Sequence, residues 1–124
     1  MATIKTYTDL EQSEKLKKIL PPESADGHYY GDGFLELETS YNPDDTPAWS
    51  QSALYNILPV TIGNILEKNA LRLRLDKGET DFAVWYENID THYVEDGLDV
   101  VESNPVDAYF QMIIKLHERG LLSK

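Results

Sequence analysis

The hydrophobic pattern is clearest near the end of the chain, where it predicts a long C-terminal helix. Apolar side chains recur there at helical spacing from Val106 to Leu116. Asn104 is a suitable N-cap, Pro105 suits the first helical position, and Gly120 follows the expected end. A helix with this many apolar positions on one side should contribute a large part of the core.

A second helix is predicted over residues 9–20. Thr8 and Glu11 have the spacing of a capping box, in which each side chain binds the backbone N–H of the other residue. Leu16 belongs to the apolar side of this helix, and Pro21 ends it because proline cannot continue the hydrogen-bond ladder.

A third, shorter helix is predicted between Ser50, its N-cap, and Pro59, just past its end. Trp49 and Leu54 have the spacing of a hydrophobic staple, which packs the residue before the cap against the first full turn. We therefore expect Trp49 to pack against this helix, although an aromatic side chain beside a loop is also a possible partner anchor.

Two hairpins are expected between these helices. Leu71, Leu73 and Leu75 alternate with polar residues, and the strand-forming residues 80–88 follow a short turn. A second hairpin is expected over residues 28–39, with its turn at an Asp-Gly pair.

The remaining segments are less regular. Residues 41–47 have the composition of a loop, residues 60–69 fit either an extended connection or a further helical turn, and residues 89–101 fit one or two short strands. Together the elements predict a single α+β domain over residues 1–124. Its small antiparallel sheet should have about four or five strands, including two hairpins, packed by about three helices.

One charge pairing follows from a single sheet. Arg72 and Arg74 would face Glu36 and Glu38 across strands, provided that both outward pairs share one face of the sheet.

Composition adds an unusual charge distribution. The 124 residues carry a formal net charge of −11, with 22 acidic and 11 basic residues and no cysteine. No lysine or arginine occurs from Ile19 to Leu66 or from Gly78 to Ile114. This charge argues against binding to nucleic acid or an anionic membrane and favours basic partners. The first residues lack an apolar run of signal-peptide length, so we expect a soluble, cytoplasmic protein.

Candidate chemistry is sparse. The lack of cysteine excludes disulfides and thiolate metal sites, and the sequence has neither a Walker loop nor a complete dinucleotide fingerprint, so no cofactor is expected. Asp90 and His92 are separated by one residue and could share one side of a strand as metal ligands or as a base and its orienting acid. A surface position in an acidic segment explains the same two residues, and we favour that interpretation.

Three functions fit these observations. We favour a non-enzymatic interaction protein that presents an acidic surface to a basic partner. A small metal-dependent or hydrolytic enzyme using Asp90 and His92 is the first alternative, and a structural homodimer formed through an exposed sheet face is the second. The candidate residues of the partner surface are Glu36, Glu38, Asp44, Asp45 and Trp49.

Three segments also resemble a known family. They are DLEQSEKLKKILP with ESAD shortly after it, WSQSALYNILP, and NPVDAYFQMIIKLHERGLL, in this order along the chain. The combination resembles a family of small uncharacterised proteins from gut bacteria, often encoded on phage-like or conjugative elements. The resemblance covers most of the chain and implies a bacterial cytoplasmic setting and an accessory role on a mobile element. It implies no catalytic residue or cofactor.

Overall fold

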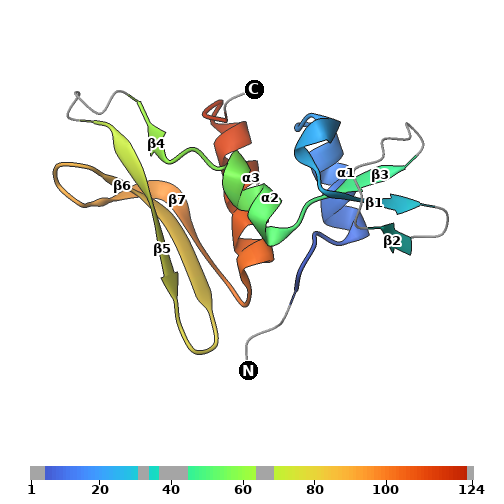
Figure 1. Ribbon diagram of the computed structural model, residues 1–124. Coiled ribbons are helices and arrows are strands. Elements are labelled where there is room, and N and C mark those ends of the chain that lie inside the picture. The colour runs from blue at the N-terminus through green and yellow to red at the C-terminus, as the bar shows by residue number, and fades with distance from the viewer. Residues whose placement is uncertain (1–4, 31–33, 37–44, 64–68, 123–124) are drawn as a thin grey trace.

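The computed structural model describes residues 5–30, 34–36, 45–63 and 69–122. These residues form three α-helices, one short 3-10 helix and seven strands (Figure 1). The α+β class, the helices and the long C-terminal helix expected from the sequence are confirmed.

The first half of the chain builds a three-stranded antiparallel sheet and one helix beside it. Its strands lie in the order β2-β1-β3. The elements are α1 (Leu10–Lys17), a 3-10 turn (Pro22–Ser24), β1 (Gly27–Tyr30), β2 (Phe34–Glu36) and β3 (Thr46–Ala48).

The second half builds a four-stranded antiparallel sheet and two helices. Its strands lie in sequence order, β4-β5-β6-β7, and the β5–β6 hairpin expected from the alternating leucines is confirmed. The elements are α2 (Gln51–Ile57), β4 (Thr61–Ile62), β5 (Leu71–Lys77), β6 (Phe82–Asn88), β7 (Val94–Glu102) and α3 (Pro105–Glu118).

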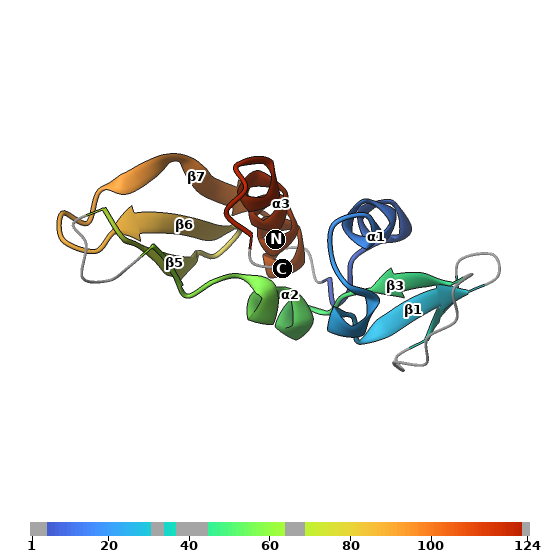
Figure 2. The same ribbon diagram turned by 90° about the horizontal axis from the view of Figure 1, so that it is seen from above.

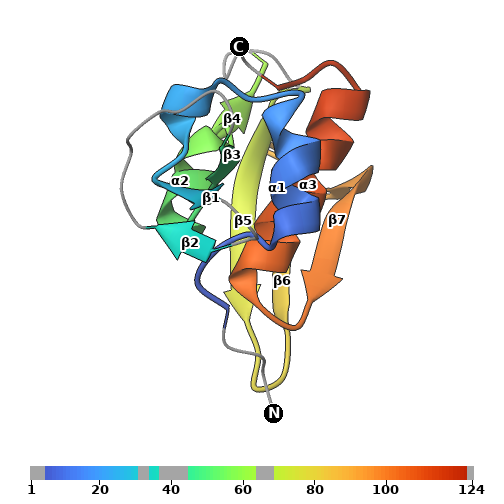
Figure 3. The same ribbon diagram turned by 90° about the vertical axis from the view of Figure 1, so that its right-hand side faces the viewer.

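The helices α2 and α3 lie between the two sheets. Figures 1 and 2 show α2 and α3 against one face of the four-stranded sheet, with α1 and the three-stranded sheet on the far side of these helices. Figure 3 looks onto α1 and the three-stranded sheet, with the four-stranded sheet behind them. One hydrophobic cluster connects these parts, from Leu16 and Trp49 on one side to Tyr86 and Leu116 on the other.

The expected ends of α3 are confirmed. Oδ1 of Asn104 accepts a hydrogen bond from the backbone N–H of Asp107 at 2.9 Å. At the other end Gly120 has a positive φ of 69°, and the backbone N–H of Leu121 reaches the carbonyl of Leu116 at 2.8 Å. Glycine adopts this left-handed conformation without a steric penalty, so the helix closes in a Schellman turn.

The cap of α1 is shifted by one residue from the expected position. Asp9, not Thr8, is the N-cap, and Gln12, not Glu11, completes the capping box. The hydroxyl of Thr8 instead lies 2.7 Å from that of Ser13 and accepts from the backbone N–H of Trp49. Thr8 is fully buried, and these two contacts give its hydroxyl the hydrogen-bond partners that a buried polar group needs.

The expectation of a single sheet is wrong. We expected a loop around Pro47, but residues 46–48 form the strand β3. β3 lies at the edge of its sheet, where proline is tolerated because its nitrogen can remain unpaired. This strand extends the first hairpin into a sheet of its own, separate from β5.

The pairing of Arg72 and Arg74 with Glu36 is consequently wrong, because β2 and β5 belong to different sheets. Glu38 lies outside the described residues. Within its own sheet, Arg74 forms an ion pair with Glu87, whose Oε1 lies 3.8 Å from Nε of Arg74.

Candidate functional site

The four-stranded sheet has an inner face against the helices and an outer face that no described element covers (Figures 1 and 2). Phe82, Val84 and Tyr86 of β6 are buried on the inner face. The residues between them and their register partners on β5 and β7 point the other way, because side chains alternate along a strand. We define the outer face by Arg72, Arg74, Asp76, Ala83, Trp85, Glu87, Val94, Asp99 and Val101.

One row of three residues crosses the outer face. Trp85 of β6 is the register partner of Arg74 on β5 and of Asp99 on β7. A cation, an aromatic ring and a carboxylate therefore stand side by side on three neighbouring strands. Val94 and Val101, also on this face, keep 51% and 62% of their surface exposed.

Glu87 holds the polar groups at one end of this face. Its Oε1 accepts from the indole N–H of Trp85 at 3.0 Å, and its Oε2 lies 2.9 Å from Nδ1 of His92. The hydrogen bonds from His92 and then Trp85, with the nearby charge of Arg74, lower the pKa of Glu87. Glu87 is therefore a carboxylate at neutral pH and fixes the direction of the indole ring.

The edge of the same sheet is acidic. β7 carries Glu95, Asp96, Asp99 and Glu102 and no lysine or arginine. It pairs with β6 on one side, and no described strand pairs with it on the other. The guanidinium of Arg119 donates a hydrogen bond to the backbone carbonyl of Asp96 on this edge.

The structure does not assemble the metal site suggested by Asp90 and His92. Both residues are exposed, and His92 contacts Glu87 instead of Asp90. The backbone N–H of Asp90 binds Oδ1 of Asn88, which closes the turn between β6 and β7. Within the described ranges, no three histidine or carboxylate side chains are grouped to hold a metal ion.

The five residues expected to form a partner surface are not brought together as one described surface. Trp49 has no exposed area, and its indole N–H binds the hydroxyl of Ser24 at 2.9 Å, so it cannot be a partner anchor. Asp45 lies 3.6 Å from Nε2 of His28, and both side chains are largely buried. Glu38 and Asp44 fall outside the described residues, as does the side chain of Glu36.

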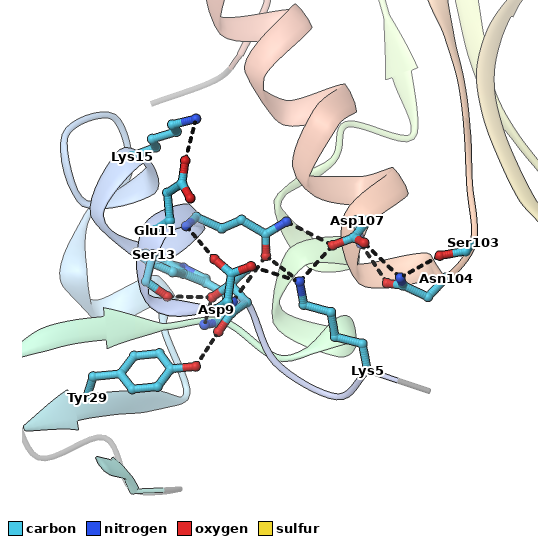
Figure 4. A network of polar contacts seen from close by, with 12 residues as sticks. Lys5, Asp9, Glu11, Ser13, Lys15, Tyr29, Ser103, Asn104 and Asp107 are labelled. Carbon is cyan, nitrogen blue, oxygen red and sulfur yellow. Dashed lines mark hydrogen bonds and ion pairs between the residues drawn. The ribbon is translucent and has the colours of Figure 1, made fainter. Parts of the chain in front are cut away.

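A polar network that sequence reasoning missed joins α1 to the start of α3 (Figure 4). Oδ1 of Asp107 accepts from the ammonium group of Lys5 and from the amide of Gln12, each at 2.8 Å. Lys5 also binds Asp9 at 3.2 Å, and Asn104 donates to the other oxygen of Asp107. These bonds join Lys5, Asp9 and Gln12 near α1 to Asn104 and Asp107 at the start of α3, so the network connects the two halves of the chain.

The network also changes the pKa values of its charged members. Partial burial opposes ionisation of Asp107, but hydrogen bonds from Lys5, Gln12 and Asn104 outweigh it and lower its pKa. Burial likewise opposes the charge of Lys5, while its bonds to Asp107 and Asp9 raise its pKa. Both groups are therefore held in their charged forms.

Comparison with known proteins finds no matching protein family, curated protein or solved structure. In the described part of the chain, no helix is long and apolar enough to cross a membrane.

Proposed function

We propose that the protein is a non-enzymatic interaction protein that binds a basic, extended segment of a partner along β7. The observation that carries the proposal is that β7 is both acidic and unpaired along its outer edge among the described residues. The resemblance to the family of small gut-bacterial proteins implies that this would be an accessory role on a bacterial mobile element.

The charge of the edge determines which partners fit. Asp96 is exposed, and Glu95 and Glu102 are partly exposed. Exposed carboxylates attract cations over about 8–10 Å at moderate salt and repel a second acidic strand. The edge therefore disfavours pairing with the β7 strand of another copy and favours a segment rich in lysine or arginine.

The backbone of the edge supplies a second source of affinity. An added strand gains main-chain hydrogen bonds along a free sheet edge, and alternate side chains provide specificity. β7 spans nine residues, which is long enough for such pairing over part of its length. The irregular pairing between Trp85 and Glu87 and the positive φ of Gly97 bend the strand near its start, so the regular stretch from Leu98 onward is the better template.

A defined peptide tests the proposal. We would titrate the isotope-labelled protein with a peptide of alternating lysine and valine, and with its glutamate–valine counterpart, following backbone amide resonances. We expect the basic peptide alone to shift and protect amides of β7, and its binding to weaken as salt is added.

Two matched variants distinguish the effect of the β7 carboxylates from the effect of the negative charge elsewhere on the molecule. The triple variant E95Q/D96N/E102Q removes three carboxylates from β7 and should weaken peptide binding by about tenfold. The control variant E14Q/E23Q/E118Q removes three exposed carboxylates from other elements and should bind nearly as wild type. Equal losses in both triple variants, or shifts located away from β7, would refute the proposal.

A further inference from the structure

We propose that the outer face of the four-stranded sheet binds the same face of a second copy of this chain, forming a two-fold symmetric dimer. The edge of β7 would stay accessible at the side of this dimer, so the inference is independent of the function proposed above.

The balance of charge distinguishes the outer face from the rest of the molecule. The chain has twice as many acidic as basic residues. The outer face carries two cations, Arg72 and Arg74, and three carboxylates, which are Glu87, Asp99 and Asp76. Two copies that meet through this face therefore experience little of the repulsion that their net charge creates elsewhere.

The row of Arg74, Trp85 and Asp99 selects the symmetry. When two sheets stack face to face about a two-fold axis that runs along β6, the β5 of one copy lies over the β7 of the other. Arg74 then faces Asp99 of the second copy, twice, while the two Trp85 rings meet at the axis. Along this axis Glu87 also faces Glu87 of the second copy, but its hydrogen bonds to Trp85 and His92 and the nearby charge of Arg74 offset its charge within each copy. An axis across the strands would instead place Arg74 over Arg74 and Asp99 over Asp99, two like-charge contacts in the central row.

The side chains of the outer face have the lengths and the apolar area that a contact between two stacked sheets needs. Stacked sheets lie about 10 Å apart, a gap that a long arginine and a short aspartate can span together. Trp85 supplies the central aromatic contact, and Val94 and Val101 supply exposed apolar area beside it. Glu87 already satisfies the indole N–H of Trp85, so covering the ring leaves no unpaired donor.

Charge-reversal variants test this geometry. In R74D and in D99R, like charges face one another at both flanks, so each variant alone should dissociate about tenfold more readily than wild type in sedimentation velocity. In a mixture of the two variants, Asp at 74 of one copy faces Arg at 99 of the other, and the remaining pair is native. The mixture should therefore recover dimers, a recovery that misfolded variants could not produce.

Fluorescence gives a second measurement on the same samples. The chain has two tryptophans, and Trp49 is fully buried, so quenching by acrylamide reports mainly on Trp85. Quenching should fall as wild-type concentration rises, because the second copy covers the Trp85 ring. A wild type that stays monomeric from micromolar to near-millimolar concentration at any salt, or a mixture that recovers no dimer, would overturn the inference and leave this face to another partner.

Discussion

The ammonium group of Lys5 lies 2.8 Å from Oδ1 of Asp107, 102 positions further along the chain. This contact joins the segment before α1 to the first turn of α3, and the amide of Gln12 converges on the same oxygen. It connects the two halves of the molecule through charge-assisted hydrogen bonds, which are stronger than bonds between neutral groups.

The first prediction concerns the stability of this connection. D107N keeps the shape of the side chain but removes its charge, so we expect the free energy of unfolding to fall by about 1–2 kcal/mol. Urea denaturation measures the change. E118Q, at the exposed end of the same helix, is the control and should stay within about 0.5 kcal/mol of wild type. Equal stability of D107N and wild type would show that the charge of Asp107 contributes nothing to stability.

The second prediction concerns pH. The pKa of Asp107 is lower in the folded protein than its ordinary value of 3.8, so folding favours the ionised form. Its stabilising contribution is present above the unfolded-state pKa and is lost as the pH falls through the lower folded-state pKa. The difference in unfolding free energy between wild type and D107N should thus be largest near neutral pH and shrink below pH 3.8. A constant difference throughout this acid range would contradict the assignment.

The third prediction distinguishes the two tryptophans. Trp49 is fully buried and packs in the core with Leu54, so W49A should cost about 3–5 kcal/mol of unfolding free energy. W85A removes a partly buried ring from the outer face and should cost clearly less. Thermal unfolding of both variants gives the comparison. A larger loss for W85A than for W49A would reverse the roles assigned here.

The fourth prediction concerns Gly97, which has a φ of 81° on β7. A Cβ atom there would meet the guanidinium of Arg119, and the left-handed conformation is strained for any residue with a side chain. We expect G97A to cost about 1–2 kcal/mol. The double variant G97A/R119A separates the causes, because relief of the clash restores part of the stability while the backbone strain remains. Chemical denaturation of the two single variants and the double variant completes the cycle.

Local patterns were sufficient to predict the elements that depend on neighbouring residues. The N-cap at Asn104, the glycine at 120 and the leucine alternation in β5 each act within a few positions, and each is confirmed. Their physical causes are short-range, so the sequence displays them directly.

Long-range partners account for the errors. Thr8 and Asp9 both suit an N-cap, and the choice between them depends on Ser13 and the backbone of Trp49, the latter 41 positions away. The strand around Pro47 depends on β1, and its presence separates the two sheets. No pattern in the sequence shows which strands share a sheet.

The candidate surfaces were predictable only in part. The absence of basic residues from Gly78 to Ile114 already indicated an acidic region, and β7 lies within it. The row of Arg74, Trp85 and Asp99 could not be predicted, because it depends on the register of three strands. The sequence could not give the register of β7 against β6, because an irregularity shifts this pairing between Trp85 and Glu87.

The position of Lys5 also affects the order of events during synthesis. The described residues up to Ser50 supply α1 and the strands β1, β2 and β3, so this half can begin to fold while the ribosome is still making the rest. Its connection to the other half must wait for Asp107, which is made 102 residues after Lys5. Until then the ammonium group of Lys5 has only Asp9 and Gln12 as the partners seen in the folded protein. The joint between the halves is therefore among the last contacts that a nascent chain can make.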